Sequence, residues 1–127
     1  MRDDQVHRYA RHILLPDVGG LGQTALMVSS AQLSLTESEP EAQLIAASYL
    51  AAGGVGSIAV TGMTQDQIAE LRAHGPDTQV NEGNDGRPIV LAPKPAWWPA
   101  APGDASALAY WRGGLGAVRW MIDVVNK

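Results

Sequence analysis

Apolar residues follow two different periods along the chain, and together they predict alternating strands and helices. Short apolar runs at about 31–35, 57–61 and 78–80 have the length of strands. Residues at about 40–52 and 64–74 instead carry apolar positions three and four apart, which is typical of amphipathic helices. Strands that alternate with helices predict an α/β fold with a mostly parallel sheet.

Local signals predict where both helices begin and end. Residues 36–39 read Thr-x-x-Glu and precede a proline, so they form a capping-box pattern for the first helix. Residues 64–67 repeat the pattern as Thr-x-x-Gln and open the next helix. The Gly-Gly pair at 53–54 closes the first helix, because glycine accepts the left-handed conformation that is common at helix ends.

The first 30 residues are expected to be mostly helical. Apolar positions at helical spacing predict a helix from Asp3 to about Leu15, which Pro16 and the glycine-rich run at 19–22 bring to an end. A short second helix is expected at 23–29, directly before the first strand.

The last third of the chain begins as a loop and ends as a helix. Residues 81–103 hold five prolines and predict a long loop that crosses the domain, with one short strand at 89–92. A helix follows at about 106–125. Its apolar residues lie four, three, four and three apart, which predicts one face packed on the core: Trp111, Leu115, Val118, Ile122 and Val125.

A length of 127 residues suits one domain with a modest core. We expect a small three-layer, Rossmann-like α/β domain, in which helices lie on both sides of a short sheet of three or four strands. The chain divides into N-terminal helices at 1–30, a strand–helix–strand core at 31–80, a proline-rich loop at 81–103 and a C-terminal helix at 104–127.

Composition narrows the classes of function. A net charge of −4 and the lack of any basic cluster argue against a nucleic-acid-binding surface. The chain has no cysteine, which excludes a disulfide, a thiolate zinc site and a cysteine nucleophile. Its N-terminal segment lacks the apolar centre of a signal peptide, and no apolar run has the roughly 18 residues of a membrane span. We therefore expect a cytoplasmic protein without membrane contact, metal or cofactor.

Three segments carry a resemblance to a known family. Residues 8–26 read RYARHILLPDVGGLGQTAL, residues 47–60 read ASYLAAGGVGSIAV and residues 69–80 read AELRAHGPDTQV. In this order they resemble the ThiF/MoeB/HesA adenylyltransferases, ubiquitin-activating-like enzymes that adenylate the C-terminus of small sulfur carriers. The first segment matches the family signature at Arg8, Tyr9, Arg11, Ile13, Leu15, Gly19, Gly22, Gln23 and Leu26, while His12 replaces the usual glutamine.

The chemistry that the resemblance implies is missing from the matching positions. Family enzymes bind the ATP phosphates at a glycine-rich turn after the first strand, where this chain reads TESEPEA at 36–42. The acid for the ribose, the basic residues for the phosphates and the Cys-x-x-Cys pairs are not found either. The chain is also much shorter than a family enzyme. Together these departures imply a truncated, degenerate pseudoenzyme.

The turn that replaces the glycine-rich one is acidic, and its residues are Thr36, Glu37, Glu39 and Glu41. Carboxylates in the first turn of a helix complement its dipole by about 0.3–1 kcal/mol each, and they repel a triphosphate. We therefore expect a sealed nucleotide turn, with Thr36 as the cap. The alternative is a pair of catalytic carboxylates or a cation site, against which ordinary first-turn charge is favoured.

Two arginines are candidates for action in another subunit. In the family, the second arginine of the opening signature reaches across a dimer into the nucleotide site of the partner. The resemblance places Arg11 at that position, with Arg8 nearby. The alternative is an ordinary surface arginine that pairs with an acid.

Two further groups of residues are candidates for partner contacts. Trp97 and Trp98 lie in the proline-rich loop and either cover the edge of the core or anchor a partner. Gly113, Gly116 and Trp120 lie on the last helix, where small residues allow another backbone to approach closely.

The main hypothesis is a non-catalytic, ThiF-like pseudoenzyme that acts as a protein-interaction or structural subunit. It would form a homodimer, or would be the accessory partner of an active adenylyltransferase to which it contributes Arg11. A ubiquitin-like carrier protein is a further candidate partner, docked at Trp97 and Trp98. The alternative is a divergent small-molecule- or nucleotide-binding domain or enzyme that uses the remnant crevice.

Overall fold

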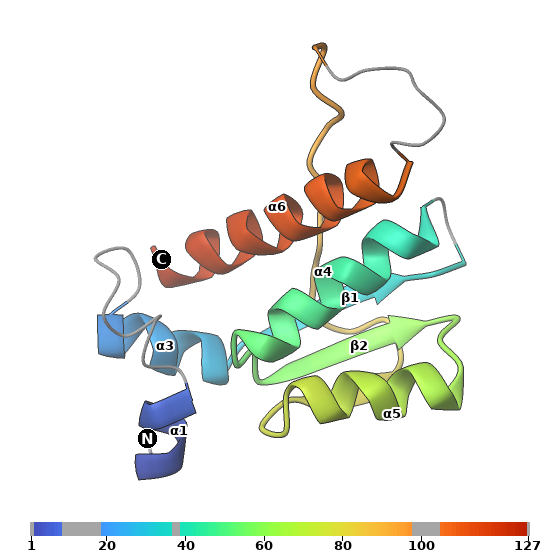
Figure 1. Ribbon diagram of the computed structural model, residues 1–127. Helices are drawn as coiled ribbons and strands as arrows, with labels where there is room; N and C mark the ends of the chain where they lie inside the picture. The colour runs from blue at the N-terminus through green and yellow to red at the C-terminus, as the bar shows by residue number, and fades with distance from the viewer. Residues whose placement is uncertain (1, 9–18, 37–38, 98–104, 127) are drawn as a thin grey trace.

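The computed structural model describes residues 2–8, 19–36, 39–97 and 105–126 (Figure 1). The elements are, in chain order, α1 (Asp3–Arg8), α3 (Gly19–Met27), β1 (Ser30–Ser34), α4 (Pro40–Ala52), β2 (Ser57–Thr61), α5 (Gln65–His74), β3 (Gln79–Glu82), β4 (Arg87–Pro88) and α6 (Ala105–Val125). The helix predicted at 3–15 is confirmed over α1, and its later part lies outside the described residues.

The four strands form one parallel sheet in the order β3-β2-β1-β4. Ala31 of β1 lies opposite Ile58 of β2, which in turn lies opposite Val80 of β3. The first three strands follow each other across the sheet, and the chain then returns to add β4 beside β1. The predicted α/β, Rossmann-like fold with a short parallel sheet is confirmed.

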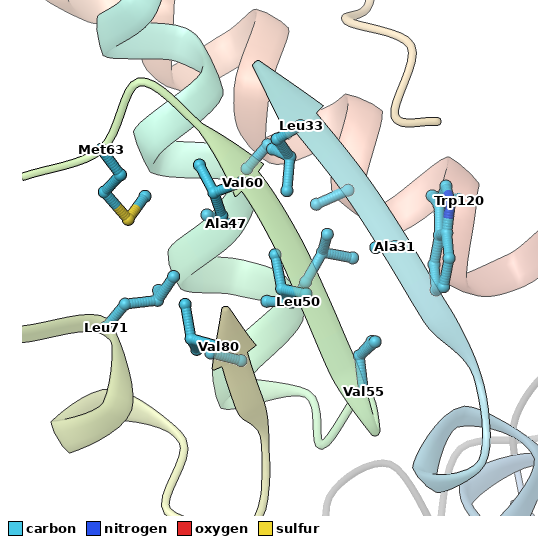
Figure 2. Packing of buried hydrophobic residues seen from close by; sticks show 14 of the residues in the cluster. Ala31, Leu33, Ala47, Leu50, Val55, Val60, Met63, Leu71, Val80 and Trp120 are labelled. Atoms are coloured by element: carbon cyan, nitrogen blue, oxygen red, sulfur yellow. The ribbon is translucent and has the colours of Figure 1, made fainter. Parts of the chain in front are cut away.

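The buried side chains of the strands lie on one face of the sheet, where α4, α5 and α6 cover them. Figure 2 shows Leu33, Val60 and Val80 packed together with Leu50 of α4 and Trp120 of α6. Buried residues alternate along β1 and β2 with exposed or half-buried ones, which are small or polar and point to the other face. A strand with one apolar face buries only that face. Among the described residues, α4, α5 and α6 are thus the helices that cover the buried strand side chains.

The ends of α4 and α5 follow the signals in the sequence. Gly54 takes the left-handed conformation after α4 (φ 83°), and the Val55 N–H donates to the Leu50 carbonyl at 3.1 Å. At α5 the Thr64 side chain accepts from the Gln67 N–H at 3.2 Å, while the Gln67 side chain accepts from the Thr64 N–H at 2.9 Å. The predicted glycine end and the predicted capping box are both confirmed.

The glycine-rich run at 19–22 lies inside α3, so the prediction that this helix begins at Gln23 is wrong. Tertiary contacts hold these glycines in the helix. Gln23 is fully buried and its amide donates to the Gly53 carbonyl at 2.9 Å. The Leu26 carbonyl accepts from the Gly56 N–H at 3.0 Å. Contacts with the end of α4 thus outweigh the low helix propensity of glycine.

The last helix exists as predicted, but it packs on the core through a different face. The buried side of α6 carries Gly113, Gly116, Ala117, Trp120 and Met121. Trp111, Val118 and Ile122 from the predicted stripe are exposed instead. Small residues face inward because α6 and α4 approach too closely for larger ones. A Cβ on Gly113 would lie 2.3 Å from the Ala42 carbonyl oxygen of α4. The predicted core face is therefore wrong at Trp111, Val118 and Ile122, while Val125 does pack against the core.

The short edge strand lies two residues before the strand predicted at 89–92. Arg87 and Pro88 pair with Ala31 and Gln32 of β1, and the Ile89 N–H still donates to the Gln32 carbonyl at 3.0 Å. Proline is tolerated here because β4 is at the edge of the sheet, where one side needs no donor. No helix within the described residues has both the length and the apolar character needed to cross a membrane.

Candidate functional site at the carboxyl edge of the sheet

The carboxyl ends of the parallel strands are the place where an open α/β sheet binds ligands. The strand order turns back at β1, because β2 lies on one side of it and β4 on the other. The turn after β1 begins at Leu35, and its counterpart after β2 begins at Gly62. A nucleotide in such a fold lies over these turns, so they form the candidate site.

Contacts within the chain hold the turns after β1 and β2 against each other. The Leu35 N–H donates to the Thr61 carbonyl at 2.8 Å. Gly62 has a φ of 83°, and a Cβ on it would lie only 2.6 Å from the Thr36 methyl group. The Thr36 hydroxyl lies 2.9 Å from the Ser34 hydroxyl, in hydrogen-bond contact. The chain's own side chains therefore occupy the space directly over this junction.

The start of α4 differs from the predicted capping box. Glu39 is the N-cap, in a left-handed conformation (φ 62°), and its own side chain makes no capping hydrogen bond. The Glu39 carboxylate instead forms an ion pair with Arg112 of α6, while the Thr36 hydroxyl is engaged by Ser34. The prediction that Thr36 caps α4 is wrong. Its physical reason is long-range: an arginine distant in the sequence competes for the glutamate.

The three predicted carboxylates are in three different situations. Glu41 is exposed in the first turn of α4, where its charge complements the helix dipole. Glu39 is paired with Arg112, and Glu37 lies outside the described residues. The structure therefore does not bring two unpaired carboxylates together in this turn among the residues it describes. A catalytic pair has no geometric support here.

Arg112 connects three parts of the domain, although the sequence pattern does not indicate it as a site residue. Besides its ion pair with Glu39, its Nε donates to the Ala92 carbonyl at 2.7 Å. The Ala92 N–H in turn donates to the Arg112 carbonyl at 3.0 Å. The segment after β4 is thereby tied to α6, and α6 to the start of α4. Nothing in the local pattern around Arg112 indicates these partners.

A hollow of about 270 Å³ lies where the strand order reverses, between β1 and β4. Gln32, Ser34 and Gln43 contribute polar groups to its lining, and Ile89 contributes apolar surface. The Oε1 atom of Gln43 is buried, and no described group donates a hydrogen bond to it. Gln43 lies three and four residues before the buried Ala46 and Ala47, so its place on the inner face of α4 could have marked it in the sequence.

The remaining predicted site residues are dispersed. Arg8 belongs to α1, whereas Arg11 and Trp98 lie outside the described residues. Trp97 is exposed and makes an edge contact with Trp111 of α6, with ring centroids 6.1 Å apart. No three His, Asp or Glu side chains of the described segments come together in a group that could hold a metal ion.

Gly113, Gly116 and Trp120, which are predicted as partner contacts, are buried against their own chain. A Cβ on Gly116 would lie 2.6 Å from the Val90 carbonyl oxygen. The backbone of α4 likewise leaves no room for a Cβ at Gly113. Trp120 is buried, and its Nε1 donates to the Arg87 carbonyl at 3.2 Å. The small-residue strip of α6 is used inside the domain.

Large apolar residues also remain accessible along the outward side of α6, as they do at Leu21, Val28 and Val90 elsewhere. We call five residues that follow one line along this helix the outer stripe: Leu108, Trp111, Leu115, Val118 and Ile122. Trp111, Val118 and Ile122 are exposed, and Leu108 and Leu115 are half-buried. Figure 1 shows α6 along one margin of the domain, with α4 beneath it. An accessible apolar line of this length is typical of an interaction surface.

Comparison with known proteins does not assign the chain to a family. No protein-family model matches the chain, and no curated protein matches it. The resemblance to the ThiF/MoeB/HesA enzymes thus remains a proposal that rests on the quoted motifs.

Proposed function

We propose that this chain is a non-catalytic, ThiF-like interaction domain that acts as a structural or accessory subunit. The observation that carries the proposal is the outer stripe, which presents large apolar side chains on a helix whose other face is filled by the core. Exposing a line of apolar side chains to water is unfavourable in free energy, and such lines are typical of proteins that bind other proteins. The partner is a second copy of the chain or an active adenylyltransferase, with a ubiquitin-like carrier as a further candidate.

The turn after β1 supports the non-catalytic part of the proposal. Its space is occupied by the Thr36–Gly62 contact, and Glu41 adds a negative charge at the start of α4. Phosphates bind at helix N-termini through free N–H groups and positive potential, and a carboxylate in the first turn opposes both. We expect no heat of binding when ATP with Mg²⁺ is titrated into the protein by calorimetry. Micromolar affinity for ATP would overturn the proposal.

The interaction part is tested by capture of the tagged protein from its native cells. We expect recovered partners to be lost from the Val118→Lys variant, because the lysine breaks the apolar line at its centre. The control is Val90→Lys, since Val90 is more exposed than Val118 but lies off the stripe. Equal capture by both variants and the wild type would mean that the stripe binds nothing. If an adenylyltransferase is recovered, Arg11→Ala tests whether this chain contributes an arginine to its rate.

A second candidate function rests on the hollow between β1 and β4. The Gln43 Oε1, to which no described group donates, would accept a hydrogen bond from a small polar ligand, and Gln32 and Ser34 offer further polar groups. A thermal-shift screen of nucleotides and metabolites tests this, with Gln43→Leu as the matched variant. Stabilisation of the wild type that Gln43→Leu abolishes would establish a ligand-binding domain in place of a pure interaction domain.

A further inference from the structure

A cleft lies between α6 and the extended segment that follows β4. It has a volume of about 230 Å³, and residues 87–93 and 116–123 form its two walls. The Trp120 Nε1 group donates to the Arg87 carbonyl at 3.2 Å, and the Arg112 Nε group donates to the Ala92 carbonyl at 2.7 Å. These contacts join the two walls, so the shape of the cleft is set within the domain before any ligand binds.

The charges that line this cleft are unequal. It holds two arginines, Arg87 and Arg119, against one aspartate, Asp123, and is therefore positive in a chain whose net charge is −4. The Arg87 Nη2 atom lies 3.5 Å from the Asp123 Oδ2 atom, and exposed ion pairs of this length contribute little. Arg119 is exposed, and no carboxylate of the described segments forms an ion pair with it. The cleft therefore has capacity for one further negative charge.

The groups beside the arginines suit a ligand that has both a charged and an apolar part. A planar guanidinium presents its donors in a fork that matches both oxygens of a carboxylate. The Leu91 N–H group donates to no described group, so the lining segment adds a backbone donor. Leu91, Pro93 and Trp120 contribute apolar surface to the same cleft. A hydrated ion such as phosphate would use the donors but would gain nothing from that surface.

We propose that this cleft binds a small monocarboxylate with an apolar group, such as an arylacetate; the site goes beyond the proposed interaction function and lies off the outer stripe. Arg119 pairs with both carboxylate oxygens, and Arg87 provides the second cation. The apolar group lies against Leu91, Pro93 and Trp120. A volume of about 230 Å³ is that of roughly eight water molecules in the liquid, which admits one phenyl ring and a carboxylate. A ligand of about ten non-hydrogen atoms in an open cleft is expected to have a dissociation constant of about 1 mM.

Chemical-shift titration by ¹H–¹⁵N NMR measures binding of this strength and also locates it. Phenylacetate is the probe, with phenylacetamide as its uncharged match and acetate as its match without the ring. We expect phenylacetate to shift the Leu91 and Gly116 amide signals and the Trp120 indole signal, with half saturation at about 1 mM. Each control ligand should need a concentration at least about tenfold higher, because it lacks either the charge or the apolar group. An equal response to phenylacetamide, or shifts confined to residues away from the cleft, would overturn the proposal.

Arg119→Gln tests the residue that holds the charge. The dissociation constant for phenylacetate should rise by at least about fivefold, because a charge-assisted pair is lost and only Arg87 remains. Lys94→Gln is the matched control, since it removes the same charge from an exposed residue that does not line the cleft. Asp123→Asn should act in the opposite direction and tighten binding about threefold, because it removes the carboxylate that competes for Arg87. An Arg119→Gln variant that binds as tightly as Lys94→Gln, or an Asp123→Asn variant that binds more weakly than the wild type, contradicts the assignment.

The class of anion is tested with inorganic phosphate. At the same concentrations it should shift these signals less than phenylacetate does, because its second charge meets Asp123 and it has no apolar part. A stronger response to phosphate would refute a carboxylate site. A wild-type spectrum that stays unchanged up to about 20 mM phenylacetate refutes the site altogether. Neither result bears on the outer stripe, because Val118 does not line the cleft.

Discussion

Replacing Gly113 by alanine tests the closest approach of α6 to α4. A Cβ at this position would lie 2.3 Å from the Ala42 carbonyl oxygen and 3.1 Å from the Ile45 Cβ. Carbon atoms in van der Waals contact are about 3.5–4.0 Å apart. The obstacle at Ala42 is backbone, so it does not move like the end of a flexible side chain. The two helices must separate by about 1 Å to admit one methyl group.

Two opposing terms decide the size of the effect. Overpacking in a filled core costs about 1–3 kcal/mol, and a backbone obstacle favours the upper end of that range. Alanine is the better helix former by about 1 kcal/mol. We therefore expect Gly113→Ala to lower the free energy of unfolding by about 2 kcal/mol. For a domain of this size that corresponds to a fall in Tm of about 8 °C.

Gly114→Ala is the matched control, because it makes the same change in helix propensity one residue away. Its Cβ would lie 3.2 Å from the Tyr49 ring, which is partly exposed and can shift. We expect stability between that of the wild type and about 1 kcal/mol above it. Urea unfolding followed by tryptophan fluorescence measures both variants at low micromolar concentration. If Gly113→Ala is as stable as Gly114→Ala, α4 and α6 do not meet through Gly113 and the assignment of the core face of α6 is wrong.

Two further substitutions test the contacts that hold the outer helices. Gln23→Ala removes a buried amide that donates to the Gly53 carbonyl, so urea unfolding should show a loss of about 2–3 kcal/mol; a loss below about 0.5 kcal/mol would mean that α3 is not anchored there. Arg112→Met keeps most of the side-chain volume but leaves Glu39 unpaired and the Ala92 carbonyl without its donor, and a loss of about 1–2 kcal/mol is expected. Part of that loss should disappear when Glu39 is also replaced by glutamine, and a fully additive double variant would contradict the ion pair.

The elements that the sequence predicts well are those whose signals are local. The strand at 57–61 and the helices at 40–52 and 65–74 have the expected bounds. A capping box at 64–67 and a glycine pair at 53–54 fix helix ends through atoms a few residues apart. No group of the described segments is seen to compete for these atoms. Local pattern and structure therefore agree.

The predictions that fail involve partners distant in the sequence. The capping pattern at 36–39 is as good as the one at 64–67, yet Glu39 pairs with Arg112 instead. The glycines of α3 are held in a helix by contacts with Gly53 and Gly56. The place of α6 beside α4 depends on which residues of each helix meet. In each case the residues that decide the local structure lie far away in the sequence, so the local pattern does not reveal the outcome.

The candidate site was predicted only in outline. The sequence places the turn after β1 and its acidic residues, because the order of strand, turn and helix is local. It does not show that Thr36 packs on Gly62, since these residues meet only when β1 and β2 pair. It also misses Gln43, whose buried oxygen is defined by the position of β4.

The two faces of α6 explain why a clean apolar stripe failed as a predictor of the core. Glycine and alanine contribute little hydrophobicity, yet they let α6 approach the α4 backbone closely, and close approach is what fills the core here. The large residues of the outer stripe are then left on the outside. Packing within the domain thus uses the small residues of this helix and not the large ones that follow the clean apolar spacing. If this division is correct, Gly113→Ala lowers the stability of the domain, whereas Val118→Lys leaves it nearly unchanged.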